Sequence, residues 1–420
     1  MEIALQGAVR KTSFLAAALA LASAFTLLTA REFLASHFAA KAELAAVRRA
    51  IALEPSNSDY RYLLGRYFWL VDRNPGQAIE AFRTAVSINP HQARYWLDLA
   101  AVYQFLGDTP AQTDAIEHAI VADPTTPDVA WEAANLYAVE GDTEKALKEF
   151  RVVLQNDPYK PPLALELCWR IQPDVDVLLR DAVPPMPGIY SFFLQMLISK
   201  KETAAAAKVW AQLAQLRQPV QKSFVFQYVR YLVVNQQPDQ ARLVWQQASG
   251  LCDVGAYQPT SQNLIVNGDF GLPVLNGGFD WLYQQSDDVS LALDPTQLHG
   301  GNRSLSIVFN SRGLEDAGIR QLVVVQPNTT YEFSAFFKAQ DIEGAGGPRF
   351  ALQDLYTSKT YFTSEELKDA DFWKQVGGVF STGPETKLLM LRIQRDPPGN
   401  AIKGRLWIDG VRLVPKSSQG

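Results

Sequence analysis

The hydrophobic and polar positions divide the chain into three stretches with different periodicities. Residues 13–30 form an uninterrupted uncharged run. Between residues 41 and 250, apolar residues recur every three or four positions, which predicts amphipathic helices. From about residue 263, short apolar or alternating runs are separated by Gly, Asn, Pro and Asp, which predicts a β-sandwich. The chain is therefore expected to be a multidomain α plus β protein.

The uncharged run predicts a transmembrane signal anchor. As a helix of about 1.5 Å per residue, residues 13–30 would span roughly 27 Å, close to the hydrocarbon thickness of a bilayer. Two other interpretations stay open, a signal peptide cleaved near the small residues 22–24 and a buried core helix.

The charges around the run indicate an orientation. Arg10 and Lys11 precede it, so residues 1–12 are expected in the cytoplasm and the bulk of the chain in the periplasm or outside the cytoplasm. Arg31 and the pair Arg48 and Arg49 follow the run and weaken this asymmetry. The expected location is the inner (plasma) membrane, in a single pass.

Prolines in similar settings indicate an internal repeat. They occur at Pro55, Pro90, Pro124 and Pro158, at intervals of 35, 34 and 34 residues. Each would end the second helix of a pair, because proline cannot continue a helix. Small and large apolar residues share one helix face, for example Ala78, Phe82 and Ala85 before Pro90. Gly107 and Gly141 would end the first helices in the left-handed conformation.

This pattern resembles the tetratricopeptide repeat family, best over residues 93–124 and well over residues 59–158. We assign residues 31–158 to an all-α solenoid, in which residues 41–55 resemble the second helix of an N-terminal half-repeat. Residues 159–258 are expected to be degenerate helical repeats that cap the array. The proline-rich interval 173–187 is expected to interrupt it.

The tetratricopeptide resemblance implies an unidentified protein or peptide partner in a groove lined by the first helix of each pair. The lysines with which some members clamp a carboxylate terminus are missing. Ordinary packing is the competing role for the aromatic candidates. The residues expected to project into the groove are Tyr62, Arg66, Arg94, Gln104, Trp131 and Asn135.

The C-terminal segment, residues 259–420, contains distinctive strand sequences in a fixed order. They are NLIVNGDF at 263–270, GFDW at 278–281, HGGNRSLSIVF at 299–309, VQPNTTYEFSAFFKA at 325–339 and LWIDGVRL at 406–413. Together they resemble galactose-binding-like jelly rolls, especially carbohydrate-binding modules attached to bacterial xylanases and glucanases. The resemblance implies an antiparallel β-sandwich. It also implies that a polysaccharide is a possible ligand, since some relatives bind one.

Sugar binding on such a sandwich requires aromatic faces that stack on a pyranose ring beside amide or acidic groups. Packing in the core is the competing role for Trp281 and Trp373. The candidate carbohydrate-binding residues are Trp281, Tyr283, Gln353, Asp354, Tyr356, Tyr361 and Trp373.

The resemblance also raises a structural calcium site, for which Asp269 and Asp409 are weak candidates. Gly271 replaces the acidic residue that relatives often carry, and calcium prefers several hard oxygen ligands. No other cofactor or metal is expected. Cys168 and Cys252 are 84 residues apart and belong to no CxxC pair, so two separate thiols are favoured over a disulfide.

Composition and motifs argue against two further functions. The chain has 39 Lys and Arg against 44 Asp and Glu, a net charge of −5, so it lacks the basic surface that nucleic-acid binding needs. It contains no G-x-S-x-G, H-E-x-x-H or P-loop sequence. We therefore expect no enzymatic activity.

The leading hypothesis is a membrane-anchored envelope scaffold with a protein-binding solenoid and a polysaccharide-binding sandwich. This architecture suggests exopolysaccharide or O-antigen assembly. The alternatives are a tetratricopeptide adaptor whose sandwich is only structural, and a polysaccharide lyase or hydrolase.

Overall fold

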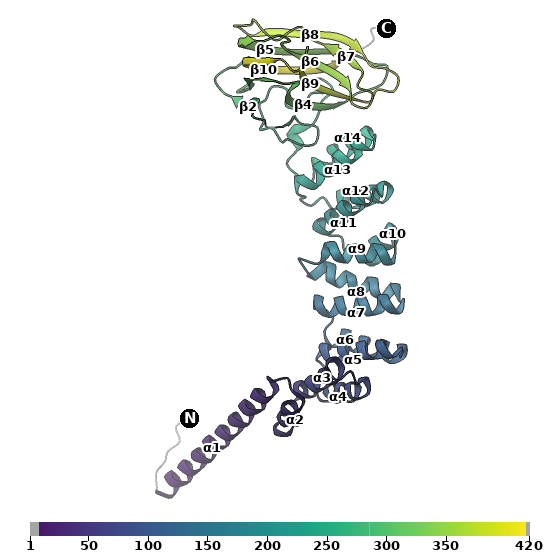
Figure 1. Cartoon of the computed structure of the whole chain (residues 1–420), viewed down its shortest axis with the longest axis vertical. Coiled ribbons are helices and arrows are strands. Elements are labelled where there is room, and N and C mark those ends of the chain that lie inside the picture. Colours follow the sequence, from purple (N-terminus) through teal and green to yellow (C-terminus); the bar gives the residue numbers. More distant parts are fainter. Residues whose placement is uncertain (1–7, 285, 417–420) are drawn as a thin grey trace. The chain divides into compact units, whose positions relative to one another are not determined.

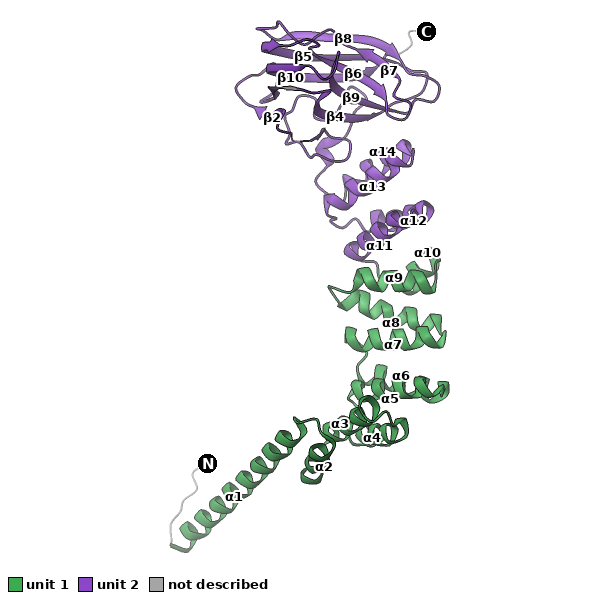
Figure 2. Cartoon of the chain, viewed as in Figure 1, with its two compact units in different colours: residues 1–184 green, residues 185–420 purple. Residues whose placement is uncertain are grey.

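The structure is a computed structural model that describes residues 8–284 and 286–416. The chain forms two compact units, Met1–Pro184 and Pro185–Gly420 (Figure 2). The first contains helices α1 to α10. The second contains helices α11 to α14 and a two-sheet antiparallel β-sandwich (Figure 1).

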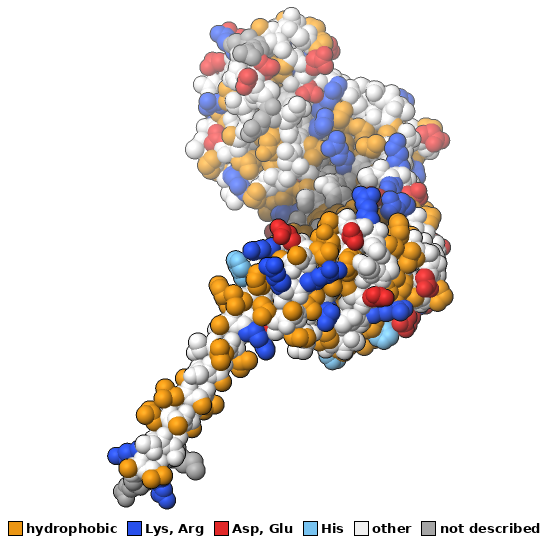
Figure 3. All heavy atoms as spheres, turned by 60° about the horizontal axis from the view of Figure 1, so that its bottom comes forward, with side chains coloured by type: hydrophobic (Ala, Val, Ile, Leu, Met, Phe, Trp, Pro, Cys, Tyr) orange, Lys and Arg blue, Asp and Glu red, His pale blue; other side chains and the backbone are white. Residues whose placement is uncertain are grey.

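Helix α1 (Ala8–Ala39) is a single long apolar helix, and its most apolar window of 18 residues is 0% buried. Hydrophobic side chains cover the face of α1 that Figure 3 shows. By length and composition the helix could cross a membrane or serve as a signal sequence. Its end continues beyond the predicted span: Ala35 and Ala39 are buried against Val47 and Ala50 of α2 (Leu44–Leu53). The predicted half-repeat is therefore completed by the last turns of α1.

Helices α3 to α8 form three antiparallel pairs, as the 34-residue interval predicts. Their shared core contains Phe82, Leu99, Ile116 and Tyr137, all almost fully buried. Gly107 and Gly141 end α5 and α7 with φ of 74° and 92°. The bounds are α3 Ser58–Leu70, α4 Pro75–Ile88, α5 Ala93–Leu106, α6 Thr109–Ala122, α7 Pro127–Glu140 and α8 Thr143–Asn156.

The helices after residue 158 also form, although their repeat signature is weak. Inside the proline-rich interval, α10 (Val175–Asp181) contacts α8, so this interval is not simply a break. Asp174 caps α10 by accepting hydrogen bonds from the amides of Asp176 and Val177, which explains a helix that the prolines concealed. The other helices are α9 Pro161–Ile171, α11 Pro187–Ser199, α12 Thr203–Leu216, α13 Lys222–Val234 and α14 Pro238–Ala248.

The sandwich consists of two five-stranded sheets, in the strand orders β1-β4-β9-β6-β7 and β2-β3-β10-β5-β8. Its core lies between them and includes Phe333, Phe337, Phe350, Leu391 and Leu406. The first sheet contains β1 Leu282–Tyr283, β4 Asp316–Val324, β6 Pro348–Asp354, β7 Thr360–Thr363 and β9 Leu388–Arg395. The second contains β2 Val289–Asp294, β3 Ser304–Gly313, β5 Thr330–Glu343, β8 Lys374–Ser381 and β10 Ala401–Pro415.

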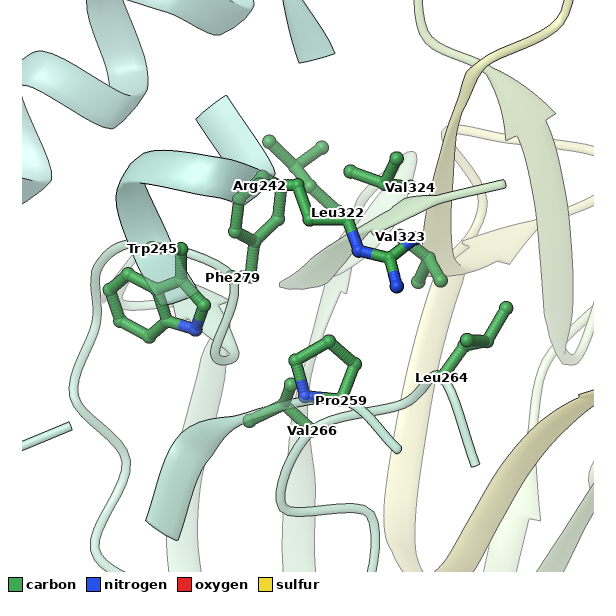
Figure 4. A pocket seen from close by; sticks show the side chains of 9 residues that line it. All are labelled: Arg242, Trp245, Pro259, Leu264, Val266, Phe279, Leu322, Val323 and Val324. Carbon is green, nitrogen blue, oxygen red and sulfur yellow. The ribbon is translucent and has the colours of Figure 1, made fainter. Parts of the chain in front are cut away.

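Helices α13 and α14 pack on the first sheet, within the second unit. The indole N–H of Trp245 in α14 donates to the carbonyl of Tyr257 at 2.8 Å, and its ring meets Phe279 edge-on. Figure 4 shows Trp245 beside Phe279, and Arg242 extending from α14 toward the β4 valines. The cavity left between these side chains is only about 10 Å³, so this interface is closely packed.

Candidate functional site

Three of the predicted groove residues of the helical repeats converge on one carboxylate. Asp98 accepts a hydrogen bond from the Tyr62 hydroxyl at 2.8 Å, and lies 3.3 Å from Arg94 and 3.9 Å from Arg66. Arg94 also pairs with Glu132 of the next repeat. Burial, followed by the charge of Asp98, raises the pKa of Tyr62 to about 12. The arginines are thus neutralised within the groove.

The other groove candidates lie apart from this cluster. Trp131 packs edge-on against Phe150 and lies under the ammonium group of Lys160. Asn135 donates to the Trp131 carbonyl at 2.7 Å, inside its own helix. The amide nitrogen of Gln104 is buried without a hydrogen-bond partner among the described residues. Sequence reasoning missed Asp98, the residue that organises the cluster.

Two of the sugar-binding candidates are structural residues inside the sandwich. Trp281 is 1% exposed, stacks on Phe270 and donates to the Asn267 carbonyl. Asp354 is 3% exposed and accepts hydrogen bonds from the amides of Tyr356 and Thr357. Both predictions are corrected here, because a buried ring or carboxylate cannot reach a polysaccharide.

Three further candidates, which lie on or next to β6 and β7, have hydrogen-bond partners within the protein. The Gln353 amide donates to Thr360 and Gln394 on the outer face. The Tyr361 hydroxyl exchanges a hydrogen bond with Thr386. The Tyr356 hydroxyl donates to the Val233 carbonyl of α13 at 2.9 Å, so Tyr356 ties the helix to the sheet.

Trp373 lies with the second sheet instead. Its ring meets His299 edge-on at 5.7 Å, and His299 stacks on Phe336 at 3.6 Å. The structure therefore does not gather the seven candidates into one site.

Tyr283 is the one candidate that lines a large cleft. The cleft measures about 760 Å³ and lies between α13 and the strands β1, β4 and β9. This volume is within the usual range for ligand sites. Its lining residues include Phe226, Gln227 and Arg230 from α13, and Asp316, Arg320, Leu322 and Met390 from the sheet. Sequence reasoning missed the cleft because α13 and β4 are far apart in the chain.

The two calcium candidates have other partners. Asp409 is fully buried and accepts hydrogen bonds from the amides of His299, Gly300 and Gly410. Asp269 accepts from the amide of Gly271. Across residues 8–284 and 286–416, three or more His, Cys, Asp or Glu side chains nowhere come together to hold a metal.

Asp280, in the loop before β1, has a perturbed carboxyl group. One of its oxygens accepts from the Leu275 amide at 2.7 Å, and the other is buried without a partner among the described residues. Burial raises the pKa of Asp280 from 3.8 to about 6.

We expect the sandwich to lose stability as the pH rises from about 4 to 6, because the folded state then holds a proton more tightly than the unfolded state. The loss from this group is about 2–3 kcal/mol. Asp280→Asn should remove this dependence and raise the free energy of unfolding at pH 7. Urea denaturation at pH 4.5 and 7, followed by intrinsic fluorescence, measures both. Equal pH slopes for the two proteins would contradict the assignment.

The chain contains tetratricopeptide-like helix pairs in its first unit and a two-sheet β-sandwich in its second, as the sequence predicts. Comparison with known proteins agrees with this class. Residues 262–399 match the family described as "Carbohydrate binding domain" (CBM_4_9). No relative among the curated proteins matches the chain.

Several solved structures are similar to parts of the chain. One, described as "CBM4 structure and function", is 16% identical with a TM-score of 0.28 and covers 36% of this chain and 99% of its own. A structure of Pseudomonas aeruginosa pilF is 18% identical, with a TM-score of 0.24 and coverages of 46% and 90%. A structure of MamA is 17% identical, with a TM-score of 0.24 and coverages of 41% and 85%. These values support no argument about function.

Proposed function

We propose that this protein is a non-enzymatic envelope scaffold, anchored in the inner membrane by α1. Its helical repeats bind a protein partner, and its sandwich binds a polysaccharide. The proposal includes a role beside exopolysaccharide or O-antigen assembly, which rests on architecture alone.

The observation that carries the proposal is the match of residues 262–399 to a carbohydrate-binding domain family. The cleft beside Tyr283 supports it, because it combines apolar walls with amide and charged groups. Apolar surface suits the faces of sugar rings, and the polar groups suit their hydroxyls.

The helical array supports the second half of the proposal. Its groove arginines are paired with Asp98 and Glu132, so they do not form a free cationic clamp. Recognition of the partner must then use shape and polar contacts along the first helices. Crosslinking in the native membrane, followed by mass spectrometry, identifies that partner.

Affinity electrophoresis of the full chain in detergent tests polysaccharide binding. We expect slower migration in gels that contain a bound polymer, drawn from xylan, β-glucan, polygalacturonate and alginate, than in gels without polymer. The same polymers should release no reducing ends or unsaturated products on incubation. Unchanged migration in every gel would favour the adaptor with a structural sandwich, and release of products would favour a lyase or hydrolase.

A further inference from the structure

The cleft between α13 and the first sheet is lined by two arginines and one aspartate, although the chain as a whole has a net charge of −5. Its charged lining residues are Arg230 from α13 and Arg320 and Asp316 from β4. Asp316 lies 3.6 Å from Arg392 of β9, so its charge is already compensated. Neither Arg230 nor Arg320 has an ion-pair partner among the residues that the structure describes. Both side chains are exposed.

The strand register concentrates this charge. Arg320 lies directly opposite Arg392 in the antiparallel pair β4 and β9. Like charges in directly opposite positions destabilise a sheet, and Asp316 compensates only the Arg392 side of this pair, so the charge of Arg320 is left without a counter-charge among the described residues. In addition, the Nε atom of Arg392 is buried without a hydrogen-bond partner among the described residues. An anion at this face would supply the counter-charge that Arg320 lacks.

Arg230 and Arg320 line the cleft next to aromatic and amide side chains that could contact a sugar ring. Phe226 of α13 and Tyr283 of β1 line the same cleft, together with the amides of Gln227 and Asn276. Arginine binds carboxylates in a planar, two-point geometry that lysine does not reproduce. The cleft thus combines aromatic rings, amides and two arginines that form no ion pair with any residue in 8–284 or 286–416.

We propose that this cleft binds an acidic polysaccharide, and that Arg230 and Arg320 grip the carboxylate of a uronic acid unit from opposite walls. The inference rests on the proposed function and names its ligand class. It also makes α13 part of the site, so the sandwich strands alone form only half of it.

Several contacts fix α13 against the sandwich, so that it forms one wall of the cleft. Tyr356 of the sandwich donates to the Val233 carbonyl of α13, and Lys387 pairs with Asp239 of α14 at 2.8 Å. The Phe226 ring occupies the space above Gly277, where a Cβ atom would lie 2.1 Å from it. These contacts come from both helices of the hairpin and fix Arg230 opposite the sheet.

The test measures binding of the full chain in detergent to immobilised polymers. Polygalacturonate and alginate supply uronates, their carboxyl-reduced forms supply the same backbones without charge, and dextran sulfate supplies a different anion. The variants are Arg230→Gln and Arg320→Gln. The matched control is Arg412→Gln, which removes the same charge from an exposed position on β10.

We expect a uronate polymer to bind at least tenfold more tightly than its carboxyl-reduced form and than dextran sulfate. Each cleft variant should weaken that binding by about tenfold or more, because each removes a charge-assisted contact, whereas Arg412→Gln should change it less than twofold. The two cleft variants should also combine non-additively, since both act on one carboxylate.

Other outcomes separate the two proposals. Binding of neutral polymers as tight as that of uronates, unchanged by both variants, would overturn the acidic ligand but keep the polysaccharide-binding function. Equal binding of dextran sulfate would show general anion attraction and overturn the uronate assignment. Loss in Arg320→Gln but not in Arg230→Gln would remove α13 from the site. Binding of no polymer at all would overturn both proposals.

Discussion

Gly278→Ala is expected to lower the free energy of unfolding of the second unit by about 3 kcal/mol, through overpacking and backbone strain together. Gly278 has a φ of 63°, a conformation that costs an alanine energy. A Cβ atom there would also lie 2.0 Å from the Trp245 ring of α14. The ring cannot retreat easily, because its N–H is bonded to the Tyr257 carbonyl and its edge contacts Phe279.

Hydrogen–deuterium exchange and urea denaturation of the full chain measure this effect. Exchange should rise most in α14 and in the loop that contains Gly278. Gly399→Ala is the matched control, since Gly399 has a φ of 82° and nothing within 4 Å of its Cβ position. It should cost only about 1 kcal/mol. If both variants lost the same stability, backbone strain alone would explain the result and the packing of Trp245 would be irrelevant.

Arg395→Met is expected to destabilise the sandwich by about 3–5 kcal/mol, with a local effect on the loop between β5 and β6. Arg395 is 3% exposed, and its guanidinium donates to the carbonyls of Ala345, Gly346 and Asn400. Burial lowers the pKa of Arg395. Methionine would fill much of the volume but would leave three carbonyl groups without their donor.

Thermal unfolding and proteolysis at the 344–347 loop report on Arg395. Arg395→Lys should recover only part of the stability, because an ammonium group cannot present the planar fork of donors that reaches all three carbonyls. Arg412→Met, at an exposed position, should change the free energy of unfolding by less than about 0.5 kcal/mol. Full stability in Arg395→Met would mean that other groups or water satisfy these carbonyls.

Strands β8 and β1 were not predicted from the sequence, and the structure shows why. Strand β8 contains Gly377 and Gly378, which have low strand propensity. A Cβ atom on Gly378 would lie 2.6 Å from the Phe362 ring, so the glycine is needed by tertiary packing and not by a local turn. Strand β1 has only two residues and exists because it pairs with β4. Neither signal is local.

The candidate site was the part that sequence could least predict. Aromatic type alone selected Trp281 and Tyr283, which are almost adjacent, yet the first is buried in the core and the second lines the cleft. Residues two apart in an extended segment share a side, so local alternation does not distinguish them. The packing of Trp281 on Phe270 and the position of α13 beside Tyr283 do. The groove candidates Tyr62, Arg66 and Arg94 lie around Asp98 in the structure, and the sequence interpretation did not single out this carboxylate.

Sequence patterns were sufficient to predict the apolar N-terminal helix, the stacked helix pairs and the β-sandwich. These depend on periodicities of 3.6, about 34 and two residues, which local chemistry fixes because each element must bury one apolar face. The packing of α13 and α14 on the sandwich, which leaves a cleft lined by Arg230 and Arg320, could be seen only in the folded structure. That arrangement depends on how surfaces from distant segments fit together, as where the Phe226 ring of α13 packs over Gly277. Such a fit produces no periodic pattern of residues in the sequence.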